Sequence, residues 1–129
     1  MNKRLRIGDI VRINGHDCVV AMVRTRHGLL VARVALIGDW RQFEVSARPV
    51  HDGEVIGRNL RHAVRAWLAA AAESHGYLKR ARLARTQAIW RREAEHRMAK
   101  ANRIERLWRR LARAETNRGG AESAKAVAQ

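Results

Sequence analysis

Three residue types with catalytic potential stand side by side near the start of the chain, at His16, Asp17 and Cys18. A cysteine becomes a working nucleophile when a base activates it and a third group orients that base. The sequence shows no such arrangement, and Cys18 opens an apolar run of the kind that fills a protein core. We therefore expect Cys18 to be a small core residue.

The remaining histidines are scattered and do not repeat at the spacings of metal ligands. At residues 51–54, His51, Asp52 and Glu54 bring two carboxylates close to a histidine, a grouping that suits acid–base chemistry. A turn between two elements explains the same residues equally well. The sequence also lacks a phosphate-binding loop and a dinucleotide fingerprint. It therefore predicts a protein that is not an enzyme and that binds no metal or cofactor.

Arginine offers a different chemistry, because its planar guanidinium can bind two phosphate oxygens at once. The chain has 27 Lys and Arg against 12 Asp and Glu, a formal net charge of +15. Between residues 77 and 118 there are 14 basic residues and four glutamates. At 100° per residue, most of these arginines share one side of a helix. The predicted nucleic-acid-binding residues are Arg82, Arg85, Arg92, Arg103, Arg106, Arg110 and Arg113.

Three interpretations of this basic side are open: it binds nucleic acid, it docks on an acidic protein, or it only faces water. Glu93 precedes Arg97, and Glu105 precedes Arg109, in the favourable i,i+4 order, but each such pair contributes only about 0.3 to 0.5 kcal/mol. The shortage of acids favours a polyanion as partner. No zinc-finger spacing, RNA-binding signature or leucine zipper is present, so we expect contacts to phosphates and leave DNA and RNA both open.

An apolar stripe runs along the opposite side of the same helix. It comprises Trp90, Ala94, Ala101, Ile104, Trp108 and Leu111, with Ile89, Met98 and Leu107 at its edges. Large apolar residues at helical spacing usually pack against another element. We expect the stripe to pack against the preceding helix, which carries Trp67, or against a second copy of the chain as a homodimer. Stacking of Trp90 or Trp108 on bases of a single strand is the alternative.

The spacing of apolar residues predicts two helices in the second half of the chain. The first covers residues 59–74, with Asn59 as its N-cap and Gly76 ending it. The second covers residues 77–117 without proline or glycine, and is about 60 Å long at 1.5 Å per residue. We expect residues 118–129 to be a disordered tail.

The first half reads as five short strands bounded by turn residues. They cover residues 5–13, 18–24, 29–36 and 40–45, with a short edge strand at Pro49 and Val50. The run from Gly8 to Arg12, leading through Asn14 and Gly15 into Val19 and Val20, resembles SH3-like small barrels of the KOW and Tudor type. The resemblance covers residues 5–57 and implies a barrel that binds RNA, nucleic-acid-processing proteins or RNA polymerase. No binding residue is carried over from it.

Together these patterns predict an α+β fold: an SH3-like barrel at residues 1–57, then a helical hairpin at residues 58–117 whose second helix is long and basic. A single cysteine and the absence of a long apolar run predict a cytoplasmic protein without membrane contact. The expected function is a nucleic-acid-binding protein, a small bacterial or phage regulator. The alternative is an adaptor or inhibitor that docks on a polymerase or an RNA-guided complex. A structural subunit of a particle that packages nucleic acid is a third hypothesis.

Overall fold

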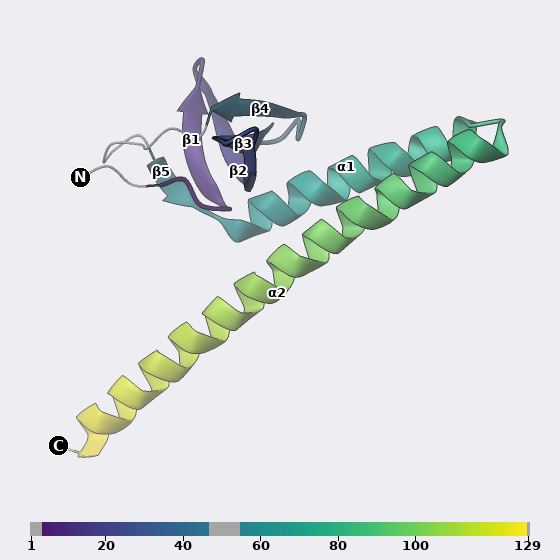
Figure 1. The fold of residues 1–129 in the computed structure, drawn as a ribbon. Coiled ribbons are helices and arrows are strands. Elements are labelled where there is room, and N and C mark those ends of the chain that lie inside the picture. Colours follow the sequence, from purple (N-terminus) through teal and green to yellow (C-terminus); the bar gives the residue numbers. More distant parts are fainter. Residues whose placement is uncertain (1–3, 47–54, 129) are drawn as a thin grey trace.

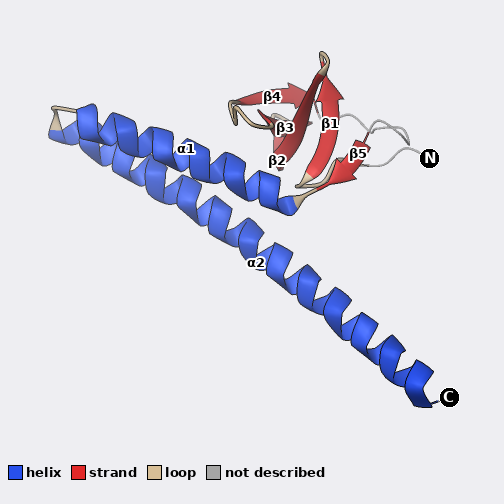
Figure 2. Cartoon of the chain, turned by 180° about the vertical axis from the view of Figure 1, so that it is seen from behind, coloured by secondary structure: helices blue, strands red, loops and turns tan. Residues whose placement is uncertain are grey.

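A five-stranded antiparallel sheet is followed along the chain by two helices, so the predicted α+β class is confirmed (Figure 1). In this computed structural model the backbone is described for residues 4–46 and 55–128, and the side chains for residues 4–46 and 55–118. The sheet lies over α1 (Leu60–Arg80), and α2 (Ala84–Ala128) turns back along α1 and continues past its N-terminal end. Figure 2 shows the same projection of α2 from behind.

The strands are β1 (Asp9–Ile13), β2 (His16–Arg26), β3 (Leu29–Leu36), β4 (Gln42–Ser46) and β5 (Val55–Arg58). β3 has the predicted bounds, and the predicted turn at Asn14 and Gly15 joins β1 to β2 with positive φ at both residues, 50° and 81°. β1 is shorter than predicted because Gly8, with φ of 91°, bends the chain before it. The predicted edge strand at Pro49 and Val50 lies outside the described residues.

The sheet is open, with strand order β4-β3-β2-β1-β5. Over residues 4–46 and 55–128, β4 and β5 do not pair with each other, and the closed SH3-like barrel is not confirmed. β1 pairs only with the first part of β2, whereas β3 follows β2 to the hairpin tip, where Leu29 pairs with Arg26. One face of the sheet packs on α1 and on Ala101 and Ile104 of α2, and the opposite face contributes to a second apolar core.

α1 begins as predicted and ends later than predicted. The Asn59 side chain accepts hydrogen bonds from the backbone N–H groups of Arg61 and His62 at 3.0 and 3.3 Å, which satisfies two otherwise unpaired donors of the first turn. The prediction that Gly76 ends the helix is wrong, because α1 continues to Arg80. A glycine inside a helix costs only about 1 kcal/mol relative to alanine, and here Tyr77 beyond it packs on α2.

The predicted bounds of the long helix, 77–117, are also wrong. The turn lies at residues 81–83. There the backbone N–H of Ala81 donates to the carbonyl of Tyr77 at 2.9 Å, and the side-chain amide of Gln87 donates to the carbonyl of Ala81 at 2.9 Å. At its other end α2 continues to Ala128, through residues predicted to be a disordered tail. Extending a helix is far easier than starting one, which favours continuation into this alanine-rich segment. Among the described residues, no helix combines the length and apolar content needed to span a membrane.

The main core joins one face of the sheet to both helices. Its buried members are Val19, Ala21, Ala35, Leu60, Ala63, Ala66, Trp67, Ala101 and Ile104. Trp67 is only 4% exposed and donates a hydrogen bond from Nε1 to the carbonyl of Ala21 at 3.0 Å. Neighbouring strand residues point to opposite faces, so Val20 belongs to a second core with Cys18 and Val34. Through this core, α2 packs against α1 and the sheet.

Candidate functional site

The predicted binding arginines occupy the outer side of α2. Six of them, which we call the arginine face, are Arg85, Arg92, Arg103, Arg106, Arg110 and Arg113. The seventh, Arg82, lies in the turn before α2. All seven are exposed. At 1.5 Å per residue the arginine face is about 42 Å long.

Two glutamates of α2 pair with arginines outside the arginine face, and Glu95 and Glu115 form no ion pair within the described residues. Glu93 accepts a hydrogen bond from Arg97 at 3.0 Å and Glu105 accepts one from Arg109 at 2.9 Å, which confirms the two predicted i,i+4 pairs. Neither arginine belongs to the arginine face. Over residues 4–46 and 55–118, none of the six guanidiniums of the arginine face, nor that of Arg82, forms an ion pair. These seven guanidiniums therefore have no carboxylate as counter-ion in the described part of the chain.

The opposite side of α2 is held against the rest of the protein. Ala94, Ala101 and Ile104 are buried, at 1%, 1% and 4% exposure. Arg97 donates a second hydrogen bond to the carbonyl of Ala70 on α1, at 2.6 Å. The predicted packing of the stripe on the preceding helix is found for these residues, whereas Leu111 at the end of the stripe is 40% exposed. The arginine face is thus presented on a fixed support and points away from the sheet.

The predicted packing tryptophans all have partners within the chain. Trp67 is in the core, as described above. Trp90 stacks on Tyr77 of α1 with ring centroids 4.6 Å apart and 27° between the planes. Trp108 lies under the guanidinium of Arg61, 4.5 Å from its ring centroid. Arg61 is a contact that the sequence analysis missed, and helical spacing alone gives no sign of it.

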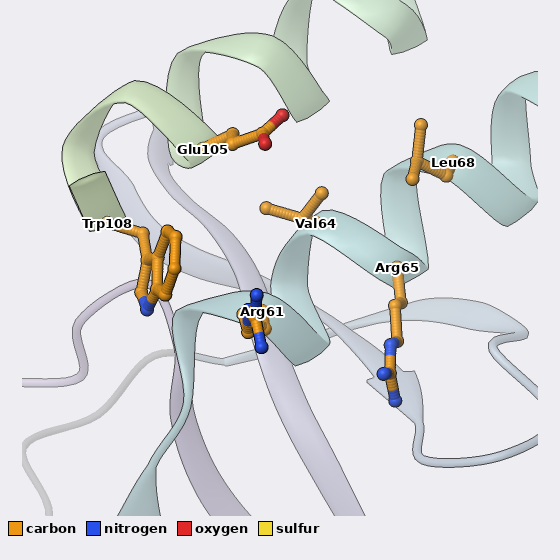
Figure 3. Close-up of a pocket in the computed structure, with 6 residues that line it drawn as sticks. All are labelled: Arg61, Val64, Arg65, Leu68, Glu105 and Trp108. Carbon is orange, nitrogen blue, oxygen red and sulfur yellow. The ribbon is translucent and has the colours of Figure 1, made fainter.

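A groove opens between the two helices where Trp108 meets Arg61 (Figure 3). Its volume is about 320 Å³. The lining residues are Arg61, Val64, Arg65, Leu68, Glu105 and Trp108. Leu68 is 43% exposed, so the groove offers apolar area beside two arginines and one glutamate.

The sheet carries a second group of arginines that the sequence analysis also missed. Arg24 and Arg26 of β2 donate hydrogen bonds to the Glu44 carboxylate of β4, the latter at 2.9 Å, and Arg33 of β3 lies 4.0 Å from it. The hydrogen bond from Arg24 holds the pKa of Glu44 below its usual value, and the charges of both β2 arginines act in the same direction. Three guanidiniums thus share one carboxylate.

His16, Asp17 and Cys18 differ in exposure and in their partners. Cys18 is buried, and burial, followed by the nearby charge of Asp17, raises the pKa of its thiol. His16 is exposed, and Asp17 pairs with Arg12 at 3.2 Å. The predicted acid–base group at residues 51–54 lies outside the described residues. In the part of the chain that is described, no cluster of three or more His, Cys, Asp or Glu residues could hold a metal ion.

Comparisons with protein-family models, with curated proteins and with solved structures find no match for this chain. A functional proposal can draw on three features of the structure: the arginine face, the groove between α1 and α2, and the arginines around Glu44.

Proposed function

We propose that the chain is a non-enzymatic nucleic-acid-binding protein that holds the phosphate backbone with the arginine face of α2. The observation that carries this proposal is the exposure of six arginines along one side of one helix, without ion pairs among the described residues. The glutamates nearest in sequence are bound to Arg97 and Arg109 instead. The face is left with positive charge that an external polyanion can neutralise.

Arginine suits phosphate because its guanidinium donates two parallel hydrogen bonds to a pair of phosphate oxygens. Such contacts position a protein on nucleic acid without reading its sequence. The support of the face matters as well, since Ala94, Ala101 and Ile104 bury the inner side of α2 and hold the helix in place. Less conformational entropy is then lost on binding than with a free basic peptide.

The proposal is tested by measuring binding against salt for the wild type and for a variant with Arg103, Arg106, Arg110 and Arg113 changed to Gln. On duplex DNA the logarithm of the affinity should fall linearly with the logarithm of salt, with a slope of about −0.9 per phosphate contact. The variant should bind roughly tenfold or more weakly at low salt and have a shallower slope, because it releases fewer counterions.

The matched control changes four exposed arginines outside the face to Gln: Arg4, Arg12, Arg41 and Arg65. Both variants lose the same formal charge, so a purely non-specific attraction would weaken equally in the two. We expect the control to keep most of the wild-type affinity. Equal losses in the two variants, or no salt-dependent binding by the wild type, would contradict the proposal.

A protein adaptor is the second candidate, and the groove between α1 and α2 favours it. Leu68 and Leu111 are 43% and 40% exposed at this groove and beside it, which leaves apolar area for a partner. An adaptor should retain its partner protein after nuclease treatment and lose it when Leu68 is changed to Glu. A nucleic-acid binder should keep its salt-dependent affinity in the same variant.

A further inference from the structure

We infer, on the basis of the proposed function, that the ligand of the arginine face is a double-stranded nucleic acid rather than a single strand. The arginines and the tryptophans lie on opposite sides of α2, and the tryptophan rings are already in contact with other side chains of the protein. The geometry therefore fits a ligand that exposes its phosphates and whose bases are paired and stacked inside a duplex.

Proteins that bind single strands combine a basic groove with aromatic rings on which successive bases stack. The two kinds of side chain must then face the same strand. On α2 they do not: Trp90 and Trp108 lie on the side that buries Ala94, Ala101 and Ile104. At 100° per residue from the two tryptophans, the six arginines of the arginine face lie at about 140° to 220°. A strand that lies along the arginines cannot reach either indole ring.

The indole rings also make contacts with other side chains of the protein. Trp90 stacks on Tyr77 at 4.6 Å, and Trp108 carries the Arg61 guanidinium at 4.5 Å. Trp40 lies 5.8 Å from the His62 ring, and Trp67 is 4% exposed. Each of these contacts takes up part of a ring surface on which a base would otherwise stack.

A duplex suits the shape and charge of α2. Double-stranded DNA carries one negative charge per 1.7 Å of its axis, about twice the density of one strand. The arginine face is straight and about 42 Å long, slightly more than one turn of B-form DNA. A rigid row of charges can meet rigid phosphates over this length without paying to order a flexible strand.

The experiment compares the full chain with DNA duplex, RNA duplex and single-stranded DNA of equal length, in direct binding and in competition at one salt concentration. We expect at least one duplex to bind about tenfold or more tightly than the single strand. The two duplex arms decide between DNA and RNA as the source of the phosphates. We also expect a steeper salt dependence for duplex DNA, near −0.9 per contact against −0.7 for a single strand.

Variants of the tryptophans give a second measurement. Changing Trp90 or Trp108 separately to Leu keeps an apolar side chain and removes the ring. Under our inference each variant that remains folded by circular dichroism binds both the duplex and the single strand within about twofold of the wild type. Base stacking would instead predict losses of about 5- to 150-fold, the equivalent of 1 to 3 kcal/mol per base.

The results that would overturn the duplex inference differ from those that would overturn the proposed function. A preference for the single strand, or a large loss of affinity in both tryptophan variants, would overturn the duplex inference and leave the proposed function standing. Absence of binding to all three ligands at low salt would overturn both. Duplex binding that survives in the quadruple Gln variant would show that the ligand is right and the arginine face is not its site.

Discussion

Glu44 shows how one carboxylate can join three strands. It accepts hydrogen bonds from Arg24 and Arg26 of β2, and Arg33 of β3 is its direct neighbour in the strand register. β4 is an edge strand, and edge strands hold their place with fewer backbone hydrogen bonds than central ones. We infer that this ion cluster helps to fix β4 on the sheet.

Changing Glu44 to Gln should lower the melting temperature at pH 7, because the three guanidiniums lose their shared counter-ion. The pKa of Glu44 is lowered in the folded chain, from a usual 4.5, so its contribution is fully present above about pH 4.5. It is lost as the pH falls through the lower, folded pKa. Thermal unfolding of both proteins from pH 7 to pH 3 checks this.

The control for Glu44 is Glu115→Gln on the exposed surface of α2, where the described residues provide no ion pair. It should have little effect on melting at any of these pH values. A Glu44 effect that does not shrink in acid would show that the substitution acts through packing and not through charge.

The core role of Cys18 could be predicted from sequence, and the role of Glu44 could not. Cys18 is followed by an apolar run, which is a local signal of a buried strand. Glu44 and Arg24 are 20 residues apart and meet only through the pairing of β2, β3 and β4. The same holds for Arg61 and Trp108, whose contact depends on how two helices cross.

Among the elements, α1 contains a residue that weakens it without an evident structural need. Gly76 lies inside the helix, and a Cβ added there would have the far end of the Arg80 side chain as its nearest neighbour, at 3.9 Å. That distance is an ordinary van der Waals contact. The glycine therefore brings the entropic cost of its free backbone with no close approach to justify it.

Changing Gly76 to Ala should stabilise the protein by about 0.5 to 1 kcal/mol. Denaturant unfolding measures the difference. Gly15→Ala is the matched control, because it adds the same methyl group into open space at a residue whose φ is 81°. That variant should be destabilised, since only glycine adopts this conformation without strain. A loss of stability in Gly76→Ala would mean that the helix end needs its glycine.

Elements with local signals were predicted well, whereas the C-terminal end of α1 and both ends of α2 were not. The N-cap at Asn59, the turn at Asn14 and Gly15 and the extent of β3 all follow from residues at the sites themselves. The turn between the helices at residues 81–83 contains neither glycine nor proline, so Gly76 was the stronger signal in the sequence for the end of the first helix. Contacts between the helices, such as Tyr77 with Trp90, decide the boundary instead.

At the scale of the whole molecule, the net charge of +15 is unevenly placed. Arg103, Arg106, Arg110 and Arg113 follow one another at intervals of three and four residues, so each neighbouring pair brings like charges together. Such pairs destabilise a helix by a few tenths of a kcal/mol each at low salt. Under the proposed function, the same repulsion that weakens the free protein is relieved when phosphates bind.

The quadruple Gln variant should therefore be more stable than the wild type at low salt, by about 1 kcal/mol for its three like-charge pairs. Gln and Arg have similar helix propensities, so the comparison isolates charge. Added salt should raise the melting temperature of the wild type more than that of the variant, because screening removes the same repulsion. Thermal unfolding by circular dichroism across a salt series checks both effects. A variant that is less stable would mean that the arginine stems contribute packing, and its weaker binding could then reflect loss of structure. A variant that is more stable and binds more weakly would tie binding to the charges themselves.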